Sequence, residues 1–353
     1  MNLCLIVGTR PQIIKSQPII NEINSKKAKL SIIHTGQHYD YELSRAFFKD
    51  LKIREPDYNL NIIRGSPIQQ LSEIISKLEK PLQKIKPDMV IIPGDTRSAL
   101  GAALAANRLD HPIAHIESGA RSFDLQMEEE VNRRLIDHCS TLLFAPTKIC
   151  YSNLKKESVL GQVFLTGDTM YDIFLYYKRK LNLRPANDEN LVVMTVHRKE
   201  NIYNYNKIKK ILNLAQEISK LGVEVVFPIH PHTKKQIKAF KLSLTGIQTV
   251  EPVTYSEMLK LLSKSTLLLT DSGGLQKEAF WLGIQCITFR GTTEWVETLS
   301  QNRNILFKKI PQFLPKQIKS LLTKPSSRKT EMQALFGEGN ASKKIASILL
   351  KEL

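Results

Sequence analysis

Short, almost uninterrupted apolar runs recur along the 353-residue chain, and each ends in a cluster containing Gly, His, Asp, Glu or Thr. In the first half they read LCLIVG, LSIIHTG, MVIIPGD, IAHIES, TLLFAPT and VFLTGD. In the second half they read LVVMTVHR, VEVVFPIH, IQTVEPV, TLLLTDSGG, IQCITFRG and ILF. Most are separated by stretches with helical spacing, such as YSEMLKLLSKS. Continuous apolar runs that alternate with helices are typical of βαβ units with buried strands, so the pattern predicts parallel sheets.

The two sets of apolar runs are divided by a polar, proline-containing segment, NLRPANDEN at residues 182–190. A chain of this length exceeds what one hydrophobic core usually serves. The prediction is therefore an α/β protein with two doubly wound parallel-sheet, Rossmann-like domains at residues 1–172 and 173–335. An amphipathic helix is expected within residues 336–353. Ligands of such sheets bind at the carboxyl ends of the strands, which directs attention to the residues there.

The net charge of +17, from 51 basic and 34 acidic residues, raises the question of nucleic-acid binding. The lysines are spread along the chain, however, and no stripe interleaves arginine with aromatic residues. We interpret the charge as a solvated surface that also suits a polyanionic small substrate, and we expect no nucleic-acid partner. A nucleic-acid-binding protein is the non-enzyme alternative, and its binding would depend steeply on salt.

The sequence indicates neither a membrane span nor a cysteine-based framework or metal site. No apolar run reaches the ~20 residues that a membrane span needs, so we expect a cytoplasmic protein without a membrane partner. The four cysteines are widely spaced and form no CxxC pair, so neither a disulfide framework nor a metal site is indicated.

The first candidate site is the segment VGTRPQIIK at residues 7–15, which reads as a strand, a glycine turn and a helix opened by a proline. Free backbone N–H groups at such a helix start favour an anion, and Arg10 and Lys15 would add positive charge. An ordinary strand-to-helix turn with an exposed arginine is the alternative. The segment matches neither GxGxxG nor a P-loop, so NAD and ATP are poorly supported.

Acidic residues follow the next strands of the first domain. Asp95 stands in IIPGDTRSAL and Glu117 in AHIESGARS, each just past an apolar run. Carboxylates at successive strand ends would point into one crevice and suit acid–base chemistry. Asp95 as a plain helix N-cap is the alternative.

The segment MEEEVNRRLIDH at residues 127–138 contains a third candidate carboxylate, Glu129. Glu129 and Arg133 stand four residues apart, as do Glu130 and Arg134. The alternative interpretation is a solvated helix face held by these salt bridges.

In the second domain, MTVHRKEN places His197 at the end of the first strand. DSGGLQKE at residues 271–278 is a bare turn in which Ser272 can cap a helix. Gly273 and Gly274 would allow an oxyanion to approach the backbone, and Glu278 could bind a ribose diol. An ordinary capped helix is the alternative.

The motifs GTRPQIIK, GDT, HIESGARS, EEVNR, HRKEN and DSGGLQKE occur in this order. Together they resemble the non-hydrolysing UDP-N-acetylglucosamine 2-epimerase family, over nearly the whole chain. The resemblance implies a GT-B-type fold, a homodimer and a role in polysaccharide biosynthesis. The implied reaction is reversible epimerisation at C-2 of UDP-N-acetylglucosamine to UDP-N-acetylmannosamine. It proceeds by elimination and re-addition of UDP through a 2-acetamidoglucal, without a cofactor or metal.

The resemblance also implies roles for individual residues, carried over from the matched motifs. The catalytic positions are Asp95, Glu117, Glu129 and His197. The positions that bind the UDP-sugar are Arg10, Lys15, Ser272, Gly273, Gly274, Glu278 and Arg290. The final helix is expected to cross back to the first domain.

Two other substrates or reactions stay open. QKE with TEWVE also resembles a branch that includes 2-epimerases of UDP-diacetamido-glucuronic acids, and a GT-B UDP-sugar glycosyltransferase would share the fold and the UDP site. In many bacterial members a second UDP-N-acetylglucosamine is an activator. Gln37 and His38 match the segment through which it acts, whereas the following YDYEL does not.

Overall fold

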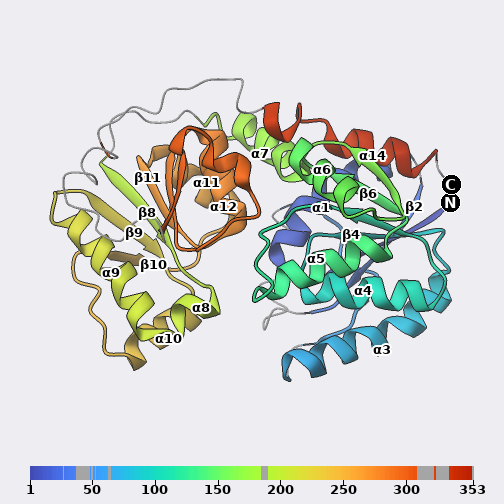
Figure 1. Cartoon of the computed structure of the whole chain (residues 1–353), viewed down its shortest axis with the longest axis horizontal. Helices are drawn as coiled ribbons and strands as arrows, with labels where there is room; N and C mark the ends of the chain where they lie inside the picture. Colours follow the sequence, from blue (N-terminus) through green and yellow to red (C-terminus); the bar gives the residue numbers. More distant parts are fainter. Residues whose placement is uncertain are drawn as a thin grey trace. The chain divides into compact units, whose positions relative to one another are not determined.

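The computed structural model describes residues 1–26, 28–36, 48, 51, 53–62, 65–183, 190–307, 322 and 334–351. The chain forms two compact units (Figure 1). The first unit comprises Met1–Leu175 together with Glu331–Leu353, and the second comprises Tyr176–Thr330. Each unit contains one parallel sheet, which confirms the predicted α/β class with two doubly wound domains.

The first unit is built on a seven-stranded sheet of order β3-β2-β1-β4-β5-β6-β7. All its pairings are parallel, so the carboxyl ends of the strands share one edge. The chain adds strands on one side of β1 and then on the other side of β4, which makes the β1–β4 junction the switch point. The strands are β1 Asn2–Val7, β2 Lys29–His34, β3 Tyr58–Asn59, β4 Met89–Pro93, β5 Ile113–Ile116, β6 Leu142–Ala145 and β7 Gln162–Leu165.

Helices cover both faces of this sheet. They are α1 Arg10–Ser25, α3 Pro67–Ile85, α4 Arg97–Arg108, α5 Glu128–Cys139, α6 Lys148–Lys156, α7 Thr169–Lys180 and α14 Ala341–Leu349. α3, α4 and α5 follow one another on one side of the sheet (Figure 1). Their apolar side chains pack with those of β1, β4 and β5 into one core. Several begin at a side-chain cap of the kind that favours helix initiation, as with Thr96 before α4 and Thr147 before α6.

The last helix of the chain, α14, packs against α1 of the first unit. The Asp172 carboxylate on α7 accepts hydrogen bonds from the backbone N–H of Ala341 (3.2 Å) and Ser342 (2.7 Å). It thereby satisfies two of the N–H groups that a helix start leaves without an intrahelical partner. The division between the two units falls within α7, three residues after Asp172.

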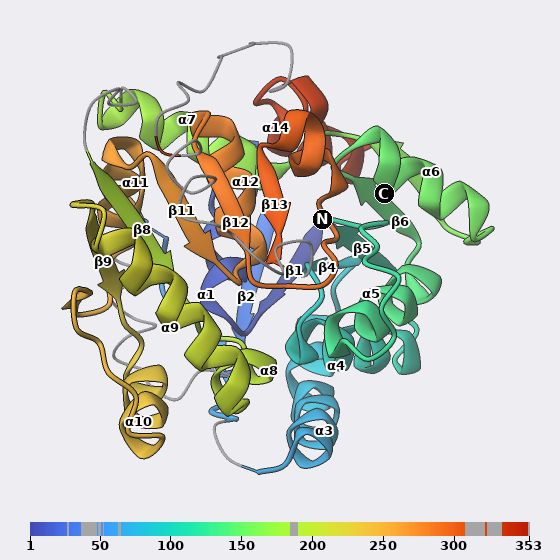
Figure 2. The same ribbon diagram turned by 60° about the vertical axis from the view of Figure 1, so that its left-hand side comes forward.

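The second unit has a six-stranded sheet of order β10-β9-β8-β11-β12-β13, again with every pairing parallel (Figure 2). Its strands are β8 Leu191–Thr195, β9 Glu224–Pro228, β10 Gln248–Val250, β11 Leu267–Thr270, β12 Gln285–Thr288 and β13 Asn304–Leu306. The helices are α8 Lys199–Ile202, α9 Tyr205–Ser219, α10 Pro231–Ala239, α11 Tyr255–Lys264, α12 Gly273–Leu282 and the 3₁₀ helix η1 Val296–Asn302. The switch point lies between β8 and β11.

Within the part of the chain that the structure describes, none of the helices combines the length and apolar character required to traverse a bilayer.

Candidate functional site

The turn between β1 and α1 lies at the switch point of the first sheet. A Cβ atom at Gly8 would lie 2.1 Å from the Ser98 hydroxyl oxygen, so only glycine fits. The Gln12 side-chain oxygen accepts hydrogen bonds from the backbone N–H of Gly8 (2.9 Å) and Thr9 (3.1 Å). Its Nε2 donates to the carbonyl oxygen of Pro93 (2.7 Å). The amide of Gln12 therefore holds the turn against the end of β4. An ionised carboxylate at this position could accept the two hydrogen bonds but could not donate one to Pro93.

Arg10 and Lys15, the two cations predicted for this segment, differ in their burial. Arg10 is the first residue of α1 and is half-buried. Lys15 lies one turn further along α1, is buried, and forms an ion pair with the Glu117 carboxylate. Gly94 allows Lys15 to reach this position, because a Cβ there would lie only 2.9 Å from the Lys15 Nζ. Glu117 itself has a φ of +72°, a left-handed conformation that is unfavourable for a residue with a Cβ.

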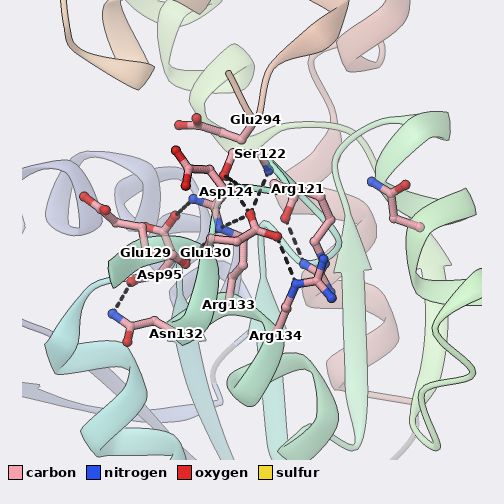
Figure 3. A network of polar contacts seen from close by, with 12 residues as sticks. Asp95, Arg121, Ser122, Asp124, Glu129, Glu130, Asn132, Arg133, Arg134 and Glu294 are labelled. Atoms are coloured by element: carbon pink, nitrogen blue, oxygen red, sulfur yellow. Dashed lines mark hydrogen bonds and ion pairs between the residues drawn. The ribbon is translucent and has the colours of Figure 1, made fainter. Parts of the chain in front are cut away.

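Asp95 follows β4, and its Oδ2 lies 2.9 Å from the Arg133 Nη2 on α5 (Figure 3). Its backbone carbonyl accepts a hydrogen bond from the Asn132 side chain (2.9 Å). Loss of hydration raises the pKa of Asp95, and the nearby charges of Glu129 and Glu117 add to this, against the opposing effects of Arg133 and Lys15. The structure thus brings the three predicted carboxylates and Lys15 within electrostatic range of one another.

Arg133 is not part of a solvated helix face, so that interpretation of the sequence is wrong for this residue. Its side chain is 2% exposed, because it points from α5 toward Asp95, and its Nε donates to the Glu129 carbonyl (2.9 Å). Glu130 is also fully buried and accepts hydrogen bonds from the backbone N–H (2.7 Å) and hydroxyl (2.9 Å) of Ser122. The expected Glu130–Arg134 pair does form, at 3.0 Å.

A buried network of polar side chains holds the turn after β5, in which Glu117 lies. The Asp137 carboxylate contacts the His115 Nδ1 (2.6 Å), the Arg121 guanidinium (2.7 Å) and the backbone N–H of Gly119 (3.1 Å). Burial opposes ionisation of Asp137, yet the positive charge and hydrogen bonds of His115 and Arg121 lower its pKa. The sequence assigned no site role to Asp137 or Arg133, and their only signal was their place as charged residues within MEEEVNRRLIDH.

In the second unit, His197 follows β8 and lies beside Asp271, which follows β11. The His197 Nδ1 is 3.0 Å from the Asp271 Oδ1. Partial loss of hydration lowers the pKa of the imidazole, but the Asp271 carboxylate outweighs this effect, and the pKa of His197 is raised. The pKa of Asp271 falls from 3.8 to about 2, because the His197 charge and several hydrogen bonds outweigh the opposing effect of burial. Asp271 is the first residue of the DSGGLQKE motif, whose pattern alone predicted no role for it.

The predicted bare turn is the N-terminus of α12. Ser272 is the N-cap, and its hydroxyl accepts a hydrogen bond from the Leu275 N–H at 3.4 Å. Gly273 and Gly274 are half-exposed helical residues. A Cβ at Gly273 would lie 2.6 Å from the Glu294 carboxylate, so a side chain there would have to displace that carboxylate. Glu278 lies further along the same helix and is buried.

Arg290 follows β12 and is held by an ion pair between its Nη2 and the Glu294 Oε2 (2.7 Å). Both side chains are buried. Next to this loop, the Lys277 ammonium lies 3.8 Å from the ring centre of Trp295, a favourable cation–π geometry. These contacts fix the loop after β12 against α12, next to the Ser272 turn.

Gln37 and His38 lie outside the described residues. Among the described residues, no group of three or more His, Cys, Asp or Glu side chains could hold a metal ion.

Three comparisons place this arrangement among known proteins. The profile of the family described as UDP-N-acetylglucosamine 2-epimerase matches residues 21–350. A Methanococcus maripaludis protein named UDP-N-acetylglucosamine 2-epimerase homolog is 40% identical, with 99% of each chain aligned. The Pseudomonas aeruginosa protein named UDP-2,3-diacetamido-2,3-dideoxy-D-glucuronate 2-epimerase is 38% identical, over 99% of this chain and 100% of that one.

A solved structure agrees with the sequence matches. The crystal structure of Methanocaldococcus jannaschii UDP-GlcNAc 2-epimerase in complex with UDP-GlcNAc and UDP superimposes with a TM-score of 0.89. It is 37% identical to this chain, and 99% of each chain is covered. The similarity confirms the GT-B-type fold class that the resemblance implied.

Proposed function

This chain belongs to the UDP-N-acetylglucosamine 2-epimerase family, and on that premise we propose that it interconverts UDP-N-acetylglucosamine and UDP-N-acetylmannosamine by inverting C-2. The observation that carries the proposal is the group of three carboxylates, Asp95, Glu117 and Glu129, gathered around Lys15 and Arg133. Inversion at carbon needs a group that removes a proton from one face and a group that returns one to the other. Several carboxyl groups at one site meet this need.

The reaction balances without an external reagent. A base takes the C-2 proton while the bond between C-1 and the UDP oxygen breaks, and the electron pair of the C–H bond forms the C-1–C-2 double bond. UDP leaves with the electron pair of the C–O bond, and 2-acetamidoglucal is formed. In the second half, UDP adds back to C-1 and a carboxyl group delivers a proton to the opposite face of C-2. The raised pKa of Asp95 suits it to carry that proton.

We assign binding of the nucleotide to the second unit. The helix α12 begins after its N-cap Ser272, and the backbone N–H groups of Gly273 and Gly274 are its first. These groups suit the diphosphate, because a helix N-terminus favours anions. Glu278 would accept hydrogen bonds from the ribose hydroxyls. His197 would stabilise the departing diphosphate.

Three cations complete the assignment. Arg290, together with Arg10 and Lys15 of the first unit, would contribute positive charge to the binding of the UDP-sugar.

A UDP-diacetamido-glucuronic acid is the second candidate substrate. It is favoured by the 38% identity to the Pseudomonas aeruginosa enzyme, which differs little from the 40% identity to the methanococcal protein. Both substrates require the same chemistry at C-2 and differ at C-3 and C-6. A cytoplasmic homodimer, the assembly expected for the family, is part of the proposal.

The deciding experiment is the reaction in deuterium oxide with UDP-N-acetylglucosamine, and in parallel with the diacetamido-glucuronate substrate. We expect deuterium at C-2 of both epimers with UDP still attached, observed by proton NMR and mass spectrometry. A glycosyltransferase would leave C-2 unlabelled, and a hydrolysing epimerase would release free N-acetylmannosamine. Unlabelled starting material with neither substrate converted would refute the epimerase proposal.

A further inference from the structure

The Asp271 carboxylate organises the segment that carries His197. It is fully buried and accepts hydrogen bonds from the backbone N–H of His197 (3.1 Å) and of Arg198 (2.9 Å). It also accepts one from the Asn201 side chain (3.0 Å) and contacts the His197 Nδ1 (3.0 Å). Four donors from one short segment therefore meet a single carboxylate that immediately precedes Ser272.

The pairing of β8 with β11 brings the His197 segment and Asp271 together. β8 and β11 are neighbours, with Thr195 opposite Thr270, and their hydroxyl groups lie 2.7 Å apart. The residues that follow the two strands emerge side by side at the same edge. Asn201 also donates to the Phe289 carbonyl (3.1 Å), which ties the segment to the end of β12.

The charges around the His197 imidazole come from three elements. Asp271 lies against its Nδ1, and Arg198 and Glu200 come from its own segment. His230, the N-cap of α10, is within electrostatic range, and His232 lies on that helix. Arg198 and His230 disfavour a charged imidazole, while Asp271 and Glu200 favour it. Asp271 is in direct contact with the ring, 3.0 Å from its Nδ1. About half of the His197 side chain is exposed, so the Nδ1 edge is held while the ring stays accessible.

We propose that Asp271 is a positioning residue that holds His197 as a doubly protonated imidazole, with Nδ1 on the carboxylate and the Nε2–H available to an oxygen of the substrate's diphosphate. The identity of that oxygen rests on the proposed function, whereas the charge state of His197 does not. Negative charge grows on the diphosphate as UDP departs, and a preorganised cationic donor stabilises that charge most when it needs no reorientation.

The first test uses the free protein and needs no activity. The His197 ring signals are assigned by comparison with His197→Gln and followed by NMR across pH. In the wild type we expect a titration midpoint above ~6.5, the value of a free histidine, and in Asp271→Asn a lower midpoint than in the wild type. Glu200→Gln, which removes a nearby charge that pairs with Arg198 and acts on the imidazole more weakly than Asp271, should shift the midpoint far less. Wild-type titration at or below ~6.5 overturns the proposal even if Asp271→Asn does not fold.

The second test asks whether Asp271 acts through His197. Asp271→Asn and His197→Gln should each lower kcat by roughly 10- to 100-fold. The double variant should lose little more than either single variant, because the two residues act as one unit. Losses that multiply, with unchanged melting temperatures, overturn the coupling. A wild-type protein that epimerises neither substrate would refute the proposed function while the NMR result for His197 still stands.

Discussion

Lys15 and Glu117 form a largely buried ion pair, although 102 residues separate them in the chain. The pair joins α1 to the turn after β5. Removing one partner of such a pair leaves an uncompensated buried charge, which is costly. The two side chains are therefore interdependent, and each holds the other at the edge of the sheet where Asp95 also lies.

Replacement of each carboxylate by its amide, in Asp95→Asn, Glu117→Gln and Glu129→Gln, should lower turnover by at least ~10²-fold, the scale of an acid–base group. Affinity for UDP, measured by calorimetry, should change little, because the proposed nucleotide contacts lie mainly in the second unit. The matched control is Glu128→Gln, since this neighbouring glutamate is half-exposed and pairs with Arg97. Near-native rates in all three variants would show that the catalytic assignment is wrong.

Glu278→Gln should weaken UDP binding by roughly 1–3 kcal/mol, the scale of a lost charge-assisted hydrogen bond. The motivation is its position on α12, whose N-terminus is the proposed diphosphate site. Calorimetry gives the affinity, and a melting curve separates it from misfolding, because Glu278 is buried. Glu251→Gln serves as the control, since that side chain is 83% exposed. An unchanged UDP affinity would remove Glu278 from the ribose.

Gly94→Ala should lower both stability and turnover. Its φ of +73° disfavours any Cβ by about 1–2 kcal/mol, and the new atom would lie 2.9 Å from the Lys15 Nζ. Gly222→Ala is the control, because its φ is +80° but a Cβ there meets nothing within 4 Å. Both variants should melt earlier, yet only Gly94→Ala should slow the reaction. Equal turnover in the two variants would argue against a role for the Lys15 position.

Acid should destabilise the second unit through Asp271. Its pKa lies at about 2 in the folded protein against 3.8, so its ionised form favours folding by about 2 kcal/mol above pH 5. Because the folded-state pKa is the lower one, this contribution disappears as pH falls from about 5 to 2. Urea unfolding of the wild type and of Asp271→Asn should therefore differ most near neutral pH and converge near pH 2. A difference that does not depend on pH would contradict the assignment.

Much of the fold could be predicted from local pattern. The apolar runs become strands of the two sheets, and most of these strands are buried, as strands that are covered on both faces must be apolar throughout. The two-residue strand β3 was not predicted, because two residues form no pattern. Ser272 was recognised as a cap from the small and polar residues that follow β11, and it does begin α12.

The site was harder to predict than the fold. Arg133 looked like a surface residue, because its spacing from Glu129 fits a solvated pair, but it is buried against Asp95. Asp271 was quoted as part of a motif, yet its partner His197 lies 74 residues away in the chain. Neither contact follows from helical or strand spacing, because both depend on which strands become neighbours.

By itself, the sequence determined the succession of strands and helices, the ordered motifs and the residue types available at each strand end. These are local properties, set by side-chain hydrophobicity, backbone preference and capping within a few residues. Only the tertiary structure decided that Lys15 pairs with Glu117, Arg133 with Asp95, and Asp271 with His197. The order of strands in a parallel sheet brings distant turns to one edge, and burial there removes the water that would otherwise satisfy each charge. In these three pairs, each buried charge is therefore compensated by an opposite charge from a segment that is distant in the sequence.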